Sequence, residues 1–330
     1  MDPSPPPLSA DDPQSSLSTT SLYRNPALGD FIIRTSDGVQ LYIYRAFLTV
    51  ASPLFADMFS LPQSSSDASG ADEPHVTVQE DSVVWEKLIA LCYAPKVPAS
   101  ADLDDLASLG RFIDAGTKYQ MPAAIAYVRA SMLMLVAKDT LGVYALACVY
   151  KFSDVARVAA RESLRLSIYH KCSDVALDLM TSHAHQRLMM YRERCGIVAR
   201  SVVNKLINMN IRPANTTWPS GTRKPGLASS VAPHLVNSCQ RPACYRVCNG
   251  KPDDQRNGAF MTYLETIHAQ LEYNPDPDLA YSESLLKAIV TTASACPTCL
   301  ERVHDKASDL SRQLRAALEE TISKVKLQME

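Results

Sequence analysis

The sequence predicts an α+β amino-terminal domain, in which helices cap a small sheet, followed by regions that are mostly helical. Three observations predict this organisation. Short β-type runs occur within residues 31–78, where turn-forming residues separate them. Farther along the chain, apolar residues recur every three or four positions, which is the spacing of one helix face. Five of the nine cysteines then gather after residue 238.

Length and composition indicate a globular protein of several parts. The 330 residues are enough for two or three packed units, and 46% hydrophobic with 21% charged residues is ordinary for such proteins. A net charge of −2 gives no electrostatic basis for binding nucleic acid, so we do not expect that partner. No stretch approaches 18 uninterrupted apolar residues, and we expect no membrane span.

The first 27 residues are rich in Pro and Ser and are expected to form a disordered tail. Their start has neither the basic residues nor the apolar core of a secretory signal. We therefore expect an intracellular location, in nucleus or cytoplasm. In such a reducing compartment cysteines are thiols or metal ligands rather than disulfides.

Two strands are predicted first, over residues 31–34 and 39–44. Asp37-Gly38 between them supplies the positive φ angles of a tight hairpin. Two short helices follow, the second with Ser52 as N-cap and Pro53 at its first position. A third strand is predicted over residues 75–78.

Three longer helices come next, each with one apolar face. The faces comprise Trp85, Leu88, Ile89 and Cys92; Leu106, Leu109 and Ile113; and Ile125, Val128 and Met132. Two strands, two helices, one strand and a run of helices fit a sheet capped by helices better than a βαβ repeat.

Residues 28–135 contain an ordered series of positions: Asp30, Arg45, Leu48, Ser52, Pro53, Phe55, Met58 and Phe59, followed by Leu-Cys-Tyr-Ala at 91–94. This stretch resembles a BTB/POZ domain. The resemblance implies a protein–protein interaction module that forms a homodimer, with the dimer face over residues 45–51. Tyr44 stands where the family usually has His, at a packing position. Cullin-recruiting members usually carry a hydrophobic-x-Glu element after Phe59, and the residues that follow here, Ser60-Leu61-Pro62-Gln63, do not contain it.

Residues 136–212 are predicted to be helical and resemble BACK-type bundles. Asp139 is expected to cap one helix, and Ser153-Asp154 to cap the next, which buries Val155, Val158 and Ala159. The longest apolar stripe of this region is one face of a long helix, either core or partner groove. It comprises Leu188, Tyr191, Cys195, Val198, Val202, Leu206 and Met209.

Residues 213–300 are predicted to form a Cys-rich helical module. Zinc favours four thiolate ligands from two short Cys pairs, so we expect Cys239, Cys244, Cys296 and Cys299 to bind a structural zinc ion. Cys248 could replace Cys244, and His234 and His304 are further candidates. The alternatives are unmetallated thiols and a disulfide or redox pair. Similar Cys pairs followed by a helix occur in some fungal BTB proteins.

Three further apolar stripes are expected in the carboxy-terminal third. They comprise Phe260, Tyr263, Leu264, Ile267 and Leu271; Leu285, Ile289 and Ala293; and Val303, Ala307, Leu310, Leu314, Leu318, Ile322, Val325 and Met329. The last stripe predicts an amphipathic helix over residues 301–330, which either folds back on its domain or pairs with a second copy. We expect it to fold back.

The motifs of common enzymes are missing from the sequence. It has no phosphate-binding loop, dinucleotide fingerprint, zinc-protease motif or nucleophile elbow, so we expect neither catalysis nor a small-molecule substrate. The predicted function is a non-enzymatic interaction scaffold or adaptor that acts through BTB-mediated self-association, with further protein partners unidentified. The alternatives are a transcriptional or chromatin regulator that uses the Cys module, and a cullin-linked substrate adaptor. Basic residues keep the first alternative open: Arg223, Lys224, Arg241, Arg246, Lys251 and Arg256.

Overall fold

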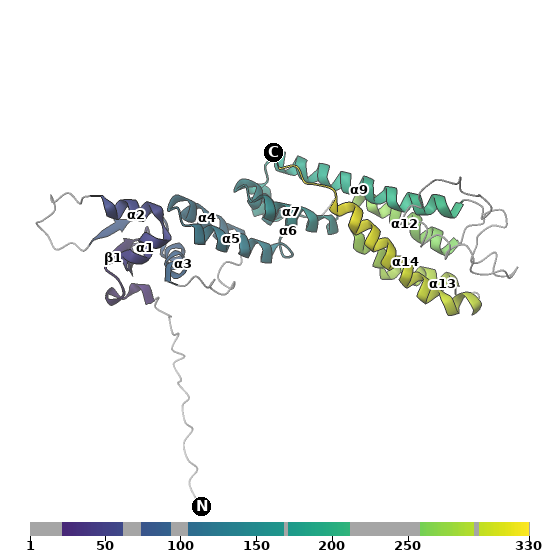
Figure 1. Ribbon diagram of the computed structural model, residues 1–330, viewed down its shortest axis with the longest axis horizontal. Helices are drawn as coiled ribbons and strands as arrows, with labels where there is room; N and C mark the ends of the chain where they lie inside the picture. Colours follow the sequence, from purple (N-terminus) through teal and green to yellow (C-terminus); the bar gives the residue numbers. More distant parts are fainter. Residues whose placement is uncertain are drawn as a thin grey trace, which may run out of the picture. The chain divides into compact units, whose positions relative to one another are not determined.

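The computed structural model describes residues 22–61, 74–93, 105–167, 171–211, 258–293 and 297–329 (Figure 1). The chain divides into two compact units, Met1–Ser131 and Met132–Glu330, and the boundary falls within helix α5 (Pro122–Leu135). Within the described ranges, no helix is long and apolar enough to cross a membrane.

The first unit is built on a three-stranded sheet in the order β2-β1-β3, from β1 (Phe31–Arg34), β2 (Gln40–Ile43) and β3 (His75–Thr77). The predicted hairpin is confirmed: β1 and β2 are antiparallel, and Gly38 takes a φ of 79° in the turn between them. β3 lies parallel to β1. Parallel pairing needs a crossover connection, which contains α1 (Arg45–Ala51) and α2 (Pro53–Ser60).

An aromatic cluster fills the core beneath these helices. The ring of Trp85 lies 6.1 Å from that of Phe55 and 4.7 Å from that of Tyr119, and the three side chains are buried. Ser52 caps α2 as predicted, because its hydroxyl oxygen accepts the Phe55 N–H at 3.2 Å. The same hydroxyl donates to the Tyr119 carbonyl oxygen at 2.5 Å, so one serine joins the start of α2 to the end of α4 (Leu106–Lys118).

Two helices, α3 (Ser82–Tyr93) and α4 (Leu106–Lys118), complete the unit together with the first part of α5. Most of their predicted core positions are buried, namely Trp85, Leu88, Ile89, Leu106, Leu109, Ile113, Val128 and Met132. Cys92 and Ile125 are half-buried instead. Before β1, the short turns η1 (Leu22–Arg24) and η2 (Pro26–Leu28) contact β2.

The second unit begins with α6 (Thr140–Val149), α7 (Ser153–Glu162), η5 (Ser163–Arg165) and α8 (Asp174–Leu179). The Asp139 cap is confirmed, since its carboxylate accepts the Gly142 N–H at 2.9 Å. The predicted Ser153-Asp154 cap is wrong. Lys151 takes a left-handed turn with φ 58°, so α7 starts one residue earlier and Phe152 is its N-cap.

The apolar face of α7 differs from the prediction. Val155 and Ala159 are buried, but Val158 is 47% exposed. The remaining core positions are Ala156 and Ala160, whose small side chains allow α6 to pack closely on this helix. The spacing indicated the helix correctly, but the buried face lies to one side of Val158.

The other described helical segments of the second unit are α9 (Ser182–Ile211), α12 (Gly258–Tyr273), η6 (Pro277–Tyr281), α13 (Glu283–Ala293) and α14 (Pro297–Ser323) (Figure 1). α12 packs on α9 and α13. The five predicted core positions of α12 are buried. α14 contacts α9, α13 and η6, which confirms that the last helix folds back. Its buried residues include Ala307, Leu310, Leu314, Leu318 and Ile322.

The buried face of α9 only partly follows the predicted stripe. Leu188, Tyr191, Cys195 and Leu206 are buried, whereas Val198 and Val202 are half-buried. Ala199 and Val203, one position farther along, occupy the core in their place. The side chain of Met209 lies outside the described residues.

Two residues of α9 hold it against α12. A Cβ at Gly196 would lie 3.0 Å from the Leu271 carbonyl oxygen, so glycine permits the close approach of the two helices. Arg192 is buried and donates to the carbonyl oxygens of Ser163, Leu166 and Tyr273. A buried cation must be hydrogen-bonded to be tolerated, and these carbonyls meet that need.

Candidate functional site

Helix α1 of the first unit leaves large apolar side chains exposed. Val50 is 89% exposed and Phe47 38%, while Tyr44 at the N-cap is 40% exposed. Leu48 is the residue that α1 buries. Tyr44, Phe47 and Val50 are spaced at three-residue intervals and constitute what we call the α1 surface.

A carboxylate fixes the start of α1. Asp30, just before β1, accepts the Arg45 N–H at 2.6 Å, which places a negative charge at the positive end of the helix. The Arg45 guanidinium lies over the rings of Phe31 and Phe59, 5.5 and 5.6 Å from their centroids. Arg45 is therefore engaged with the core side of the helix rather than with the α1 surface.

Tyr93, the last residue of α3, supports the α1 surface from beside it. Its hydroxyl accepts the Tyr44 N–H and donates to the Leu28 carbonyl oxygen, both at 3.3 Å. Its ring centroid lies 4.3 Å from that of Phe47. Residues 91–94 belonged to the family resemblance, which gave no indication of this contact with α1.

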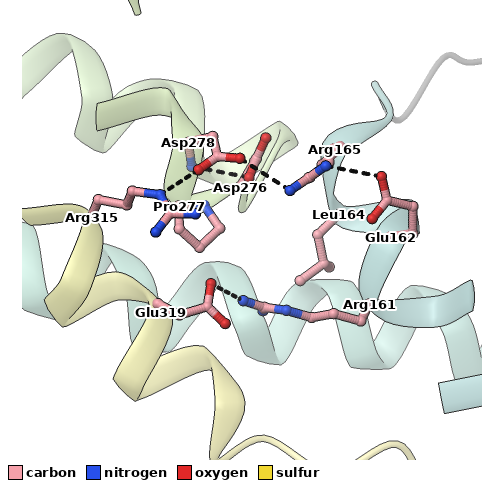
Figure 2. A pocket seen from close by; sticks show the side chains of 9 residues that line it. All are labelled: Arg161, Glu162, Leu164, Arg165, Asp276, Pro277, Asp278, Arg315 and Glu319. Atoms are coloured by element: carbon pink, nitrogen blue, oxygen red, sulfur yellow. Dashed lines mark hydrogen bonds and ion pairs between the residues drawn. The ribbon is translucent and has the colours of Figure 1, made fainter. Parts of the chain in front are cut away.

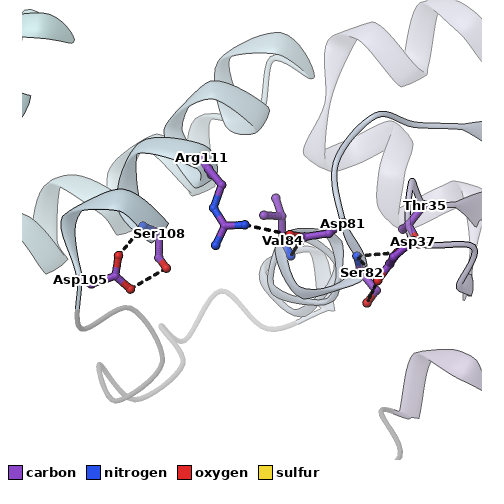
Figure 3. A network of polar contacts seen from close by, with 8 residues as sticks. All are labelled: Thr35, Asp37, Asp81, Ser82, Val84, Asp105, Ser108 and Arg111. Carbon is purple, nitrogen blue, oxygen red and sulfur yellow. Dashed lines mark hydrogen bonds and ion pairs between the residues drawn. The ribbon is translucent and has the colours of Figure 1, made fainter. Parts of the chain in front are cut away.

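A polar network ties the hairpin turn to the helices of the first unit (Figure 3). The Asp37 carboxylate accepts the Ser82 hydroxyl at 2.7 Å, the Ser82 N–H at 3.1 Å and the Thr35 hydroxyl at 2.5 Å. These hydrogen bonds lower the pKa of Asp37 to about 2. Asp81 accepts the Val84 N–H and pairs with Arg111 of α4, each at 2.9 Å.

This network has the geometry of helix caps. Its carboxylates are engaged with the first N–H groups of α3, and Asp105 caps α4 in the same way through Ser108 (Figure 3). It therefore positions the helices that support α1.

A charged cleft of about 280 Å³ lies in the second unit, between η5, η6 and α14 (Figure 2). Asp278 accepts from Arg165 at 3.1 Å and from Arg315 at 2.6 Å. Glu319 accepts from Arg161 at 2.7 Å. The arginines of this cleft point at carboxylates of the same cleft, which makes it an internal ion-pair network that joins distant segments.

The predicted zinc ligands lie almost entirely outside the described residues. This holds for Cys239, Cys244 and Cys296. Cys299 is the third residue of α14, and its side chain is also outside the described part. The alternative ligands Cys248 and His234 lie outside it too, whereas His304 is exposed on α14. Among the described residues there is no group of three or more His, Cys, Asp or Glu side chains that could hold a metal ion.

Of the four cysteines whose side chains are described, Cys195 is buried and Cys92, Cys148 and Cys172 are half-buried. Burial raises the pKa of Cys92 to about 12 and that of Cys195 to about 11. Burial also raises the pKa of Cys148 and Cys172. Because the thiolate is the reactive form, these four cysteines are poor nucleophiles at neutral pH.

Residues 20–133 match the family model for the BTB/POZ domain. The match covers the three-stranded sheet, the α1–α2 crossover, helices α3 and α4 and most of α5. The chain contains a BTB/POZ domain. Such domains are generally protein–protein interaction modules. A search of curated proteins found no match to the chain.

The residues that carried the BTB resemblance have structural roles in the domain. Asp30 and Arg45 start α1, Ser52 starts α2, and Phe55 lies in the aromatic cluster. Tyr44, predicted to be a packing position, is 40% exposed and belongs to the α1 surface. The predicted dimer face over residues 45–51 coincides with α1.

Proposed function

We propose that the protein is a non-enzymatic interaction scaffold or adaptor that self-associates through the α1 surface of its BTB domain. One observation carries the proposal: the domain belongs to an interaction family, and its first helix leaves Tyr44, Phe47 and Val50 exposed to solvent. Covering such apolar side chains with a partner is favourable, because it removes their surface from water.

A second copy of the chain is the occupant that the chemistry of this surface favours. A twofold dimer places the same patch of both copies in contact, so the patch must complement itself. The α1 surface consists of apolar and aromatic side chains, and the charge nearest to it on α1, Arg45, lies over Phe31 and Phe59. An uncharged apolar patch can meet its own copy without repulsion.

Val50→Glu tests this proposal. The wild-type chain should be a dimer at micromolar concentration by light scattering, and the variant a monomer, since the change places a charge in the apolar contact. At 89% exposure Val50 contributes little to the core, so the far-ultraviolet circular dichroism should stay unchanged.

Val83→Glu is the matched control, because Val83 of α3 is also exposed, at 55%, and lies outside the α1 surface. It should leave the dimer intact. A monomeric wild-type chain, or equal dissociation by both variants, would show that α1 does not mediate self-association.

We also propose that Cys239, Cys244, Cys296 and Cys299 bind one structural zinc ion. The two cysteine pairs flank α12 and α13 in the sequence, and these helices pack on each other and, through α13, on α14. Four thiolates fill a tetrahedral site, so the metal would stabilise this part of the unit rather than activate water. The site rests on the spacing of the cysteines.

Elemental analysis of reduced, chelator-free protein should find about one zinc per chain. Cys296→Ser should release the metal and expose the carboxy-terminal third to protease. Cys92→Ser, which removes a half-buried thiol from α3, should retain it. Wild-type protein without zinc would rule out the proposed site.

A further inference from the structure

The helical unit has a second cleft, of about 600 Å³, between α7, α9 and the segment that follows α14. This volume is within the range of binding sites for small organic molecules. Arg157 and Arg161 of α7 line it on one side and Lys326 on another. Val325 and Leu327 contribute an apolar wall.

This cleft differs from the cleft in Figure 2 in the charges of the residues that line it. Carboxylates face the arginines there, whereas the described residues that line the larger cleft include no Asp or Glu. Arg157 and Lys326 make no ion pair with any residue in the described ranges. Arg161 is paired with Glu319, so two of the three cations of this cleft have no ion-pair partner among the described residues.

Arg161 also has an unused donor. Its Nη2 donates to Glu319 at 2.7 Å, but its buried Nη1 finds no hydrogen-bond acceptor within the described part of the chain. A buried N–H group without an acceptor is costly. An acceptor that enters the cleft would remove this cost.

The neighbours of Arg161 add to the same site. Arg157 lies one turn earlier on α7, so its side chain emerges on the same helix face. Tyr191 lines the cleft from α9. Burial and the neighbouring Cys195 raise the pKa of Tyr191, and nearby Arg161 acts in the opposite direction.

We propose that this cleft binds a phosphate monoester with an apolar organic group, whose phosphate contacts Arg157, Arg161 and Lys326 and whose organic group packs on Val325 and Leu327. A phosphate monoester carries a charge of about −1.5 to −2 at neutral pH, which matches the two cations that have no ion-pair partner among the described residues. Guanidinium groups bind phosphate oxygens through two parallel hydrogen bonds, and Arg161 has Nη1 available.

Calorimetric titration of the full-length chain with phenyl phosphate tests the proposal. Saturable binding to one site per chain is expected. Inorganic phosphate should bind at least about tenfold more weakly, because it lacks the group that packs on the apolar wall. Equal affinity for both ligands, or no binding of phenyl phosphate at millimolar concentration, would overturn the proposal.

A phosphotyrosine peptide distinguishes the two sources of this chemistry. If the peptide binds more tightly than phenyl phosphate, the natural ligand is a phosphorylated protein segment. If the cleft excludes the peptide and retains phenyl phosphate, the ligand is a small organic phosphate. Either result supports a phosphate site.

The double variant Arg157→Gln, Lys326→Gln removes two of the three cations. Both side chains belong to exposed residues without ion pairs in the described ranges, so the fold should be unaffected, as checked by circular dichroism. Affinity for phenyl phosphate should fall by at least about tenfold. Lys324→Gln is the matched control: Lys324 is 68% exposed, pairs with Glu320 and does not line the cleft. Unchanged affinity in the double variant would overturn the assignment.

Discussion

The BTB domain fastens its helices with short side chains that accept N–H groups at helix starts, whereas the helical unit has such caps and also uses arginines that reach distant segments. Asp37, Ser52 and Asp105 accept N–H groups at the starts of α3, α2 and α4. In the helical unit, Arg192 binds the carbonyl at the end of α12, and Arg161 binds Glu319 of α14. A cap orders one turn, whereas a buried arginine such as Arg192 joins several segments. Removing such an arginine should therefore destabilise more of the unit than removing a cap.

The largest effect is expected in the apolar core of the BTB domain. Trp85→Ala removes the fully buried ring between Phe55 and Tyr119 and should cost about 3–5 kcal/mol of unfolding free energy. Chemical denaturation measures the loss, and hydrogen exchange should increase in α3 and α4. Exchange that rose equally in α9 and α12 would show that the two units unfold as one.

Arg192→Met should have the next largest effect. It leaves the carbonyls of Ser163, Leu166 and Tyr273 without their donor, at a cost of about 3 kcal/mol. Hydrogen exchange should increase at the ends of both η5 and α12. Arg194→Met, two residues farther along α9, is the control, since Arg194 donates to a carbonyl of its own helix at an exposed site. Similar losses in both variants would contradict the joining role of Arg192.

Asp37→Asn should cost about 1 kcal/mol, the typical contribution of a helix cap. Its folded pKa of about 2 lies below the ordinary 3.8, so its contribution to stability is complete above pH 4 and is lost as the pH falls towards 2. The free energies of unfolding of the wild type and the variant, measured by chemical denaturation, should therefore converge as the pH falls from 4 to about 2. Asp57→Asn, at an exposed position on α2, is the control, and its free energy of unfolding should change with pH as that of the wild type does.

The smallest effect is expected for an exposed arginine. Arg312 is 70% exposed and pairs with Asp309, which is 59% exposed, so Arg312→Gln should change stability by less than about 0.5 kcal/mol. A loss equal to that of Arg192→Met would show that burial does not decide which arginines stabilise the helical unit.

The features that the sequence predicted are local ones. Asp37-Gly38 indicated the hairpin, and Ser52 and Asp139 indicated helix starts, because each acts within a few residues of its own position. Apolar spacing also identified the core of α12. It failed at Val158, where a spacing of three or four residues fits two adjacent faces of the helix.

The features that were missed depend on residues far apart in the chain. No pattern near β3 shows that it pairs parallel to β1, and nothing around Arg192 marks it as the donor to Tyr273. The BTB resemblance predicted the candidate surface as residues 45–51. It did not predict that the Tyr93 ring packs against Phe47 and supports this surface. The zinc site stays a prediction, since most of its ligands lie outside the described residues.

Helix α9 is synthesised before the two helices that cover its apolar face. The apolar face of α9 includes Leu188 and Leu206, and α12 and α14 cover this helix in the folded unit. A ribosome completes α9 long before α12, because residues 212–257 are made between them. The nascent chain thus carries an uncovered apolar helix for the time that this segment takes to translate, which is when a chaperone would have most to protect.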